Sequence, residues 1–345
     1  MRLPCRLREA EAVTYWLVVA PLVACLPANV AYRLACWRGD WTFRYRREKR
    51  SHVVRNMRSV LGDELGPEEA ERLALEFFRM LSCEVIDVMR LRGRARSLGK
   101  LVEIRGREHL DAALAGGKGA ILCSAHFGSC GSAFSLLHAS GFPVTAVGRW
   151  EWNQPGTPPG LQRFWDIVKG RRLLRHRQRP NIEPSPGRFR VAAQVIAALR
   201  ANEVVTILSD AAPLEADLAR SVEVPFLGRK ARLLPGVVSI ARLADAPVLM
   251  FFMHRLADYH HQVLEILPPV TMQAETADAF GHCVAIMDAA IRANPAHWVY
   301  WANTDDLNSL GLLPPAPLAV SPQSIASEPA MLLEDRRSVP GRKRQ

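Results

Sequence analysis

The stretch Gly119-Ala120-Ile121-Leu122-Cys123-Ser124-Ala125-His126-Phe127-Gly128 decides the fold class. Its first six residues are apolar or small, which is typical of a strand that is buried on both faces. Residues 132–138 then favour a helix, so His126 lies where a buried strand gives way to a helix. Open α/β sheets bind their ligands beyond the carboxyl ends of such strands. The stretch therefore predicts an α/β sheet with a candidate site at His126.

Short apolar runs alternate with helical patterns from about residue 100 onward, which is typical of an α/β sheet. Residues 40–92 are expected to be helical, with the clearest helix starting at Pro67, and further helices are predicted over residues 188–200 and 277–293. The predicted strands are Leu101–Ile104, Ala120–Cys123, Pro143–Val147, Val204–Leu208, Val248–Met253 and Gln262–Ile266. We therefore expect a central mixed β-sheet flanked by helices.

An uncharged and strongly apolar segment of about 21 residues lies between Glu11 and Arg33. This length is close to the roughly 20 residues that a membrane-spanning helix needs, but Pro21, Pro27 and Asn29 interrupt the segment. A bent span and an interfacial anchor both remain open, and a buried core helix or a cleaved signal peptide are the alternatives. Basic residues are more numerous after the segment than before it, which favours a body that faces the cytoplasm.

The chain divides into three predicted parts: a membrane anchor or interfacial helix over residues 1–38, an α/β domain over 39–312, and a disordered basic tail over 313–345. A formal net charge of +11 indicates an anionic partner. No nucleic-acid recognition motif is visible, so we expect an anionic membrane surface or a phosphorylated substrate. Seven scattered cysteines without a C-x-x-C pair predict neither a disulfide framework nor a metal site, and His260-His261 is interpreted as structural.

His126 is the candidate general base. The amino terminus of the following helix is expected to disfavour a charged imidazolium and so to keep the ring neutral. A neutral imidazole can accept the proton of a hydroxyl that attacks an acyl thioester, while backbone N–H groups near Gly128 and Gly131 stabilise the oxyanion. Taken alone, a histidine after a strand is a weak signal, and a capping or loop-filling role is its more common explanation. Cys130 as an acylated nucleophile is a minor alternative.

Residues 124–129 resemble the His-Phe-Gly-Asn-Trp-Glu block of bacterial lipid A late acyltransferases, which transfer lauroyl or myristoyl groups, and of the similar phosphatidylinositol mannoside acyltransferases. Both belong to the lysophospholipid acyltransferase superfamily. Further blocks resemble the family in the same order: Gly148-Arg149, Gly170-Arg171, and residues 203–210, 222–228 and 294–301. Together with the apolar start, the resemblance extends from about residue 10 to residue 306.

The resemblance implies a glycerol-3-phosphate acyltransferase-like fold. It also implies the transfer of a fatty acyl group from acyl carrier protein or coenzyme A to a hydroxyl, or an amine, of a membrane lipid or lipid-linked glycan. No cofactor beyond the thioester co-substrate and no metal are implied, and the expected location is the cytoplasmic (inner) membrane. The substrate-binding residues that it implies are Phe127, Gly128, Ser129, Gly131, Arg149, Arg171, Pro225, Phe226 and Gly228.

One position departs from the family motif His-x-x-x-x-Asp/Glu, because Gly131 stands where the acid belongs. Losing an orienting acid can cost on the order of 10⁴ in rate. Asp210 is the candidate replacement, provided that the end of its strand points at His126, and Glu84 and Asp87 are weaker candidates. The alternative is a catalytically degenerate relative that binds lipid or an acyl carrier at the membrane.

Overall fold

The computed structural model describes residues 14, 18–62, 65–90, 100–148, 182, 188–213, 215–272 and 275–313. These residues all belong to one unit, which ends at Leu313. Two predicted substrate-binding residues, Arg149 and Arg171, lie outside the described residues, as does the predicted tail from residue 314 onward.

A six-stranded sheet with the order β1-β8-β7-β2-β4-β3 forms the centre of this unit. Neighbouring strands are parallel except for β7 and β8, which are antiparallel, so the sheet is mixed as predicted. The strands are β1 (Val102–Arg105), β2 (Ala120–Ser124), β3 (Val144–Val147), β4 (Val204–Leu208), β7 (Val248–Arg255) and β8 (Gln262–Pro269). All six predicted strands are confirmed, each with its start within one residue of the prediction.

Strand β2 lies between β7 and β4 and is buried along its whole length. Ile121 and Cys123 belong to the larger hydrophobic cluster, with helices α10 (Arg188–Arg200), α11 (Gly236–Ala244) and α12 (Thr276–Ala293). Ala120 and Leu122 belong to a second cluster, with α7 (Arg107–Ala115) and α8 (Cys130–Ala139). Successive residues of β2 therefore contribute to two apolar layers in turn, and each layer is covered by its own helices.

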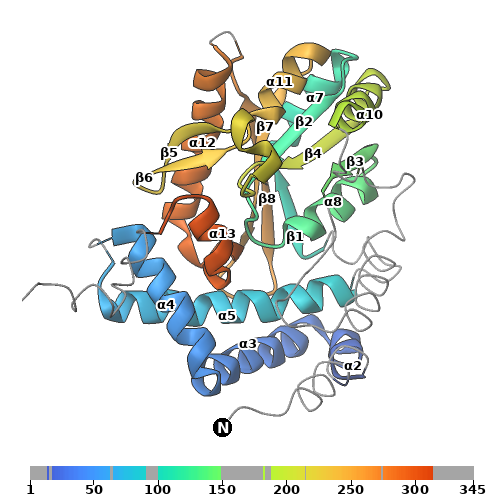
Figure 1. Cartoon of the computed structure of the whole chain (residues 1–345). Coiled ribbons are helices and arrows are strands. Elements are labelled where there is room, and N and C mark those ends of the chain that lie inside the picture. The colour runs from blue at the N-terminus through green and yellow to red at the C-terminus, as the bar shows by residue number, and fades with distance from the viewer. Residues whose placement is uncertain are drawn as a thin grey trace, which may run out of the picture. The chain divides into compact units, whose positions relative to one another are not determined.

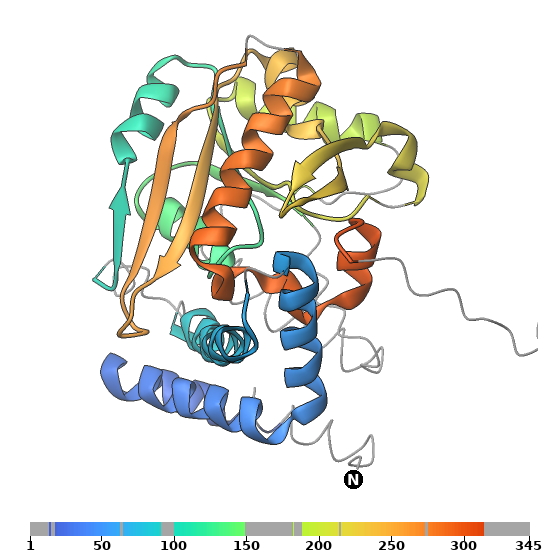
Figure 2. The ribbon, with the colours of Figure 1, turned by 90° about the vertical axis from the view of Figure 1, so that its left-hand side faces the viewer.

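The helices α2 (Ala20–Cys25), α3 (Ala28–Tyr45), α4 (Arg47–Leu61) and α5 (Pro67–Arg90) precede the sheet in the chain. Helix α5 begins at Pro67 as predicted. Its Asp87 accepts a hydrogen bond from Ser129, which follows β2, so α5 lies at the carboxyl end of that strand. Figures 1 and 2 show α5 between the sheet and α3.

The predicted membrane anchor is represented in the described residues by α2 and the first part of α3. Helix α3 continues past residue 38 to Tyr45 and packs against α5 through Ala31, Tyr32 and Ala35. Among the described residues, no helix is both long enough and apolar enough to cross a membrane.

A two-stranded antiparallel hairpin, β5 (Val222–Phe226) and β6 (Arg229–Leu233), lies outside the main sheet. Residues 222–228 resemble a family block, but neither strand of the hairpin was predicted from the sequence. Leu227 and Gly228 connect the strands with φ values of 52° and 79°, the positive values that tight hairpin turns require. The chain also forms 3₁₀ turns at Glu215–Arg220, Pro295–His297 and Val299–Ala302, and a last helix, α13 (Thr304–Ser309).

Candidate active site

His126 and Asp210 meet beyond the ends of two adjacent parallel strands. Ser124 and Leu208 are partners in the pairing of β2 with β4, and His126 and Asp210 each follow two residues later. His126 Nδ1 lies 2.7 Å from Asp210 Oδ1, and the backbone N–H of His126 donates to Asp210 Oδ2 at 2.8 Å. The condition set for Asp210, that its strand end points at His126, is therefore met.

The Asp210 carboxylate is completely buried, so its oxygens require donors from the protein. Besides the two donors of His126, the indole N–H of Trp298 donates to Asp210 Oδ2 at 2.8 Å. The carboxylate is thus held by groups from two separate segments of the chain. Trp298 lies in a block that resembles the family, but no role for this residue was predicted from the sequence. Because a buried indole needs an acceptor for its N–H, the tryptophan in this block was the signal that could have predicted a polar contact here.

The protonation of His126 is governed by two opposing effects. Burial lowers the pKa of the imidazole, but the charge of Asp210 and the hydrogen bond to it raise the pKa, with smaller contributions from Asp306 and Glu84, and the net shift is upward. The expectation that a helix terminus would favour the neutral ring was therefore wrong in direction, because α8 begins only at Cys130 and a carboxylate contacts the ring directly. One third of the His126 side chain is exposed, and Nε2 is the ring nitrogen left for a substrate.

An aromatic ring adjoins the His126 ring. The Tyr300 ring centroid lies 5.0 Å from that of His126, and burial raises the pKa of Tyr300, so its hydroxyl stays protonated. Burial, followed by the charges of Glu84 and Asp210, also raises the pKa of the Cys130 thiol. A protonated thiol is a poor nucleophile, which disfavours the minor alternative of an acylated Cys130.

The backbone at Gly128 is not free to bind an oxyanion, contrary to the expectation. Its N–H donates to His297 O at 2.8 Å. Its φ is +55°, and a Cβ atom at this position would lie 2.0 Å from Met253 O. Glycine is therefore required here for close backbone packing.

Helix α8 offers fewer unbound donors than the sequence suggested. Cys130 N donates to Gly128 O at 2.9 Å, and Ser132 N donates to Ser129 O at 2.8 Å. The N–H of Gly131 forms a hydrogen bond with the Cys130 sulfur, which is a weak acceptor, and it stays a candidate donor for the oxyanion.

Phe127 and Ser129 both have buried contacts within the protein. The Phe127 ring is fully buried and stacks on His297 with ring centroids 5.2 Å apart. Ser129 Oγ donates to Asp87 Oδ2 at 2.6 Å and accepts from Arg255 Nη2 at 2.8 Å. These contacts support the loop that carries His126, and substrate contact by either side chain stays a prediction.

Asp87, a weaker candidate for the missing acid, forms a buried ion pair with Arg255 instead. It also accepts hydrogen bonds from Tyr32 Oη at 2.6 Å and Gln262 Nε2 at 3.2 Å. The side chains of Asp87 and Arg255 are 0% and 3% exposed. This buried cluster links α3, α5, β7 and β8 to Ser129.

The predicted residues Pro225, Phe226 and Gly228 lie in the β5–β6 hairpin. The Phe226 ring packs edge-on against Trp298 with centroids 5.8 Å apart and an interplanar angle of 88°. Pro225 and Gly228 are exposed. The hairpin thus supports Trp298, which in turn contacts Asp210, and direct substrate contact by these residues stays a prediction.

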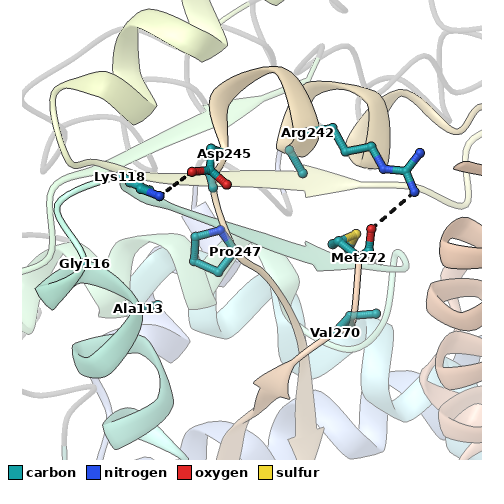
Figure 3. Close-up of a pocket in the computed structure, with 10 residues that line it drawn as sticks. Ala113, Gly116, Lys118, Arg242, Asp245, Pro247, Val270 and Met272 are labelled. Atoms are coloured by element: carbon teal, nitrogen blue, oxygen red, sulfur yellow. Dashed lines mark hydrogen bonds and ion pairs between the residues drawn. The ribbon is translucent and has the colours of Figure 1, made fainter. Parts of the chain in front are cut away.

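A pocket of about 620 Å³ lies at the opposite end of the sheet (Figure 3). Its lining includes Lys118, two residues before β2, and Pro247, which immediately precedes β7. Lys118 forms an ion pair with Asp245, which also lines the pocket (Figure 3). Because His126 follows the carboxyl end of β2, this pocket is separate from the His126 site.

One group of side chains in the described part of the chain has the spacing of metal ligands: Asp258, His260 and His261, whose ligand atoms lie within 4.8 Å of one another. Asp258 Oδ1 accepts the backbone N–H groups of His260 and His261 at 3.1 and 3.0 Å. Asp258 Oδ2 lies 2.7 Å from His261 Nδ1. These bonds stabilise the turn between β7 and β8.

Comparisons with known proteins agree with the sequence resemblance. The family model described as bacterial lipid A biosynthesis acyltransferase matches residues 4–303. A lipid A biosynthesis acyltransferase of Haemophilus influenzae is 23% identical over 253 residues, which make up 73% of this chain and 74% of the relative. All six sequence blocks lie within the matched range. The chain therefore belongs to the bacterial lipid A biosynthesis acyltransferase family.

Proposed function

We propose that the protein transfers a fatty acyl group from a thioester of acyl carrier protein or coenzyme A to a hydroxyl of a membrane lipid or lipid-linked glycan. His126 Nε2 accepts the proton of the acceptor hydroxyl as its oxygen attacks the thioester carbonyl carbon. The tetrahedral intermediate then breaks its C–S bond, and the imidazolium returns the proton to the departing sulfur. An ester and a free thiol result, and the base is regenerated.

The 2.7 Å contact between His126 Nδ1 and Asp210 Oδ1 carries this proposal. The carboxylate fixes the tautomer with the proton on Nδ1, directs Nε2 away from itself and offsets the charge that the ring gains. Asp210 thereby supplies what Gly131 lacks. This arrangement supports an active enzyme over a degenerate relative, since a protein that only binds lipid has no need of an oriented imidazole.

The candidate oxyanion donor is the Gly131 N–H, at the positive end of the α8 dipole. A glycine at this position leaves room for the thioester carbonyl to approach the backbone. Arg149 and Arg171 are proposed to bind the anionic part of the donor or the acceptor.

We also propose that α2 and α3 attach the protein to the anionic cytoplasmic face of the inner membrane. Helix α3 packs one face on α5 and exposes the opposite face. That face, with α2, presents a row of exposed apolar side chains: Val18, Val19, Leu22, Leu26, Val30, Leu34, Trp37, Trp41 and Tyr45. Tryptophan and tyrosine favour the interfacial region of a bilayer, and basic residues near the row match anionic lipids. The arrangement favours an interfacial anchor over a membrane span.

An acyl-transfer assay tests the proposed reaction. The purified full chain is supplied with labelled acyl thioesters of acyl carrier protein or coenzyme A, together with a membrane extract, and the labelled lipids are separated. The wild type should produce a labelled ester that His126→Ala lacks. The control is His52→Ala, an exposed histidine of α4, which should leave the product unchanged.

Two results would contradict the proposal. If His126→Ala gives the same product as the wild type, His126 is not the base. If the wild type binds lipid or acyl carrier but yields no product with any donor, the degenerate alternative is correct.

A further inference from the structure

Two cysteines from different helices lie next to each other in the helical layer below the sheet. Cys36 of α3 and Cys83 of α5 have sulfur atoms 3.8 Å apart. The helices run antiparallel at this point: Tyr32 contacts Asp87 on one side of the cysteine pair, and Asp40 contacts Arg79 on the other. The two thiols therefore occupy facing positions in the middle of a regular helix pair.

The backbones of α3 and α5 approach each other closely beside these cysteines. A Cβ atom on Gly39 would lie 2.7 Å from Arg79 Cα and 2.8 Å from Arg79 N. Only glycine fits there, so the spacing of the helices is set by backbone contact. A disulfide requires that the Cα atoms, and the Cβ atoms, of its two cysteines lie close together. Closely packed helices favour these short distances. The sulfur atoms must approach by a little under 2 Å to reach a bond length of about 2.0 Å.

The two thiols differ in accessibility. Cys36 is partly exposed, whereas Cys83 is buried. The hydrogen bond with Cys83, assisted by the charge of Arg79, lowers the pKa of Cys36. The same hydrogen bond and burial raise the pKa of Cys83. Cys36 is therefore suited to react first with an oxidant, and Cys83 is placed to attack the oxidised Cys36.

We infer that Cys36 and Cys83 form a redox-active pair, which a peroxide converts into a disulfide that ties α3 to α5. The Cys36 thiolate attacks one peroxide oxygen, the O–O bond breaks, and hydroxide leaves, so that Cys36 becomes a sulfenic acid. The Cys83 sulfur then attacks the Cys36 sulfur, the S–O bond breaks, and the hydroxide departs as water with the Cys83 proton. In total, two thiols lose two electrons and two protons, and one peroxide gives two waters.

The position of this disulfide gives it a structural consequence. It closes a loop between residues 36 and 83 and holds Tyr32 against Asp87, one helical turn away. Asp87 in turn bonds Ser129 in the loop that carries His126. Oxidation therefore fixes α3 on the side of α5 that faces away from the active-site loop. This inference does not depend on the proposed acyl transfer.

Peptide mapping tests the pair directly. The purified full chain is treated with hydrogen peroxide, remaining thiols are alkylated, and the protein is digested without reductant. A peptide pair joined through Cys36 and Cys83 should appear and should be lost on reduction. Cys36→Ser and Cys83→Ser should each abolish it. In Cys83→Ser, Cys36 should remain as a sulfenic acid that dimedone captures. Cys25→Ser, which removes an exposed cysteine of α2, should leave the cross-link intact.

Thermal unfolding provides a second measurement. Peroxide should raise the Tm of the wild type by several degrees, because a cross-link restricts the unfolded chain, and reductant should reverse the rise. Cys36→Ser should show no rise. The inference fails if both thiols can still be alkylated after peroxide treatment of the folded wild type, if Cys36 is over-oxidised without a cross-link, or if the main disulfide involves other cysteines.

Discussion

Trp298 donates its indole N–H to the same carboxylate oxygen of Asp210 that accepts the backbone N–H of His126. The other oxygen of Asp210 is thereby left for the His126 ring. Trp298 comes from a 3₁₀-rich segment near the carboxyl end of the described residues, and its neighbour Val299 donates to His126 O at 3.0 Å. This segment thus contacts both Asp210 and the backbone of His126.

Trp298→Phe should reduce turnover by about tenfold while KM changes little. Removing a donor to a buried carboxylate costs about 1–3 kcal/mol, and a loosened Asp210 no longer fixes the His126 ring. Trp301→Phe is the matched control, because its indole donates to Pro295 O at 2.7 Å instead. Steady-state kinetics and denaturant unfolding of both variants separate the effects. If both lose turnover equally, Trp298 acts only through stability.

The raised pKa of His126 predicts the pH dependence of the reaction. Since the base must be unprotonated, kcat/KM should rise with pH, with a midpoint above the ordinary histidine value of 6.5. Asp210→Asn removes the charge that raises this pKa, so the midpoint should move to lower pH. The maximal rate should also fall by on the order of 10⁴, since the tautomer is no longer fixed.

Asp305→Asn is the control for the pH profile, because Asp305 is an exposed carboxylate on α13. Its profile should match that of the wild type. A midpoint that stays unchanged in Asp210→Asn would show that the titrating group is not His126 in contact with Asp210.

Gly131→Glu restores the acid of the family motif, but we expect no gain in rate. In the proposed mechanism Asp210, which contacts His126 Nδ1, already takes the role of that acid. A new carboxylate beside Cys130 would adjoin Glu84, whose charge already acts on Cys130, and like charges repel. Gly281→Glu, at an open position of α12, controls for an added charge. A rate increase of tenfold or more in Gly131→Glu alone would show that the natural site lacks an effective acid.

The sequence predicted the elements of this site but not their pairing. Periodicity placed a strand at Val204–Leu208 and a helix at residues 188–200, and both have these bounds in the structure. It could not show that β4 pairs with β2 in the register that brings Asp210 to His126, because register depends on contacts between segments far apart in the chain. For this reason Asp210 remained a conditional candidate.

The sequence failed at two other features for different reasons. The β5–β6 hairpin was missed because its strands are short and contain Pro225, and because Leu227 occupies a turn position where asparagine or glycine is usual. At Gly128 the glycine was correctly singled out but wrongly explained. Its neighbour is Met253 O of β7, a contact that no local pattern reveals.

Gly128→Ala should destabilise the domain by about 3 kcal/mol or more, since the added Cβ atom meets a backbone oxygen and the positive φ disfavours it. Gly117→Ala separates the two causes, because Gly117 has a similar φ of +70° with nothing within 4 Å of the added atom. It should cost only about 1 kcal/mol. Urea unfolding of the two variants measures the difference, and equal losses would show that β7 yields to the new side chain.

The proposal that the exposed row on α2 and α3 attaches the protein to a membrane can be tested with vesicles. Trp37 is 65% exposed, and Leu243 on α11 is 70% exposed but lies outside the row. If the row enters the bilayer interface, Trp37→Glu should weaken binding to vesicles that contain phosphatidylglycerol by about tenfold or more, since it replaces a favourable interfacial ring with a negative charge. Leu243→Glu adds the same charge and should change little.

Wild-type binding should also fall with added salt and on vesicles of phosphatidylcholine alone, because part of the attraction is electrostatic. If both variants weaken vesicle binding equally, the loss is caused by the change in net charge. If neither variant weakens binding, the protein binds the membrane through another surface.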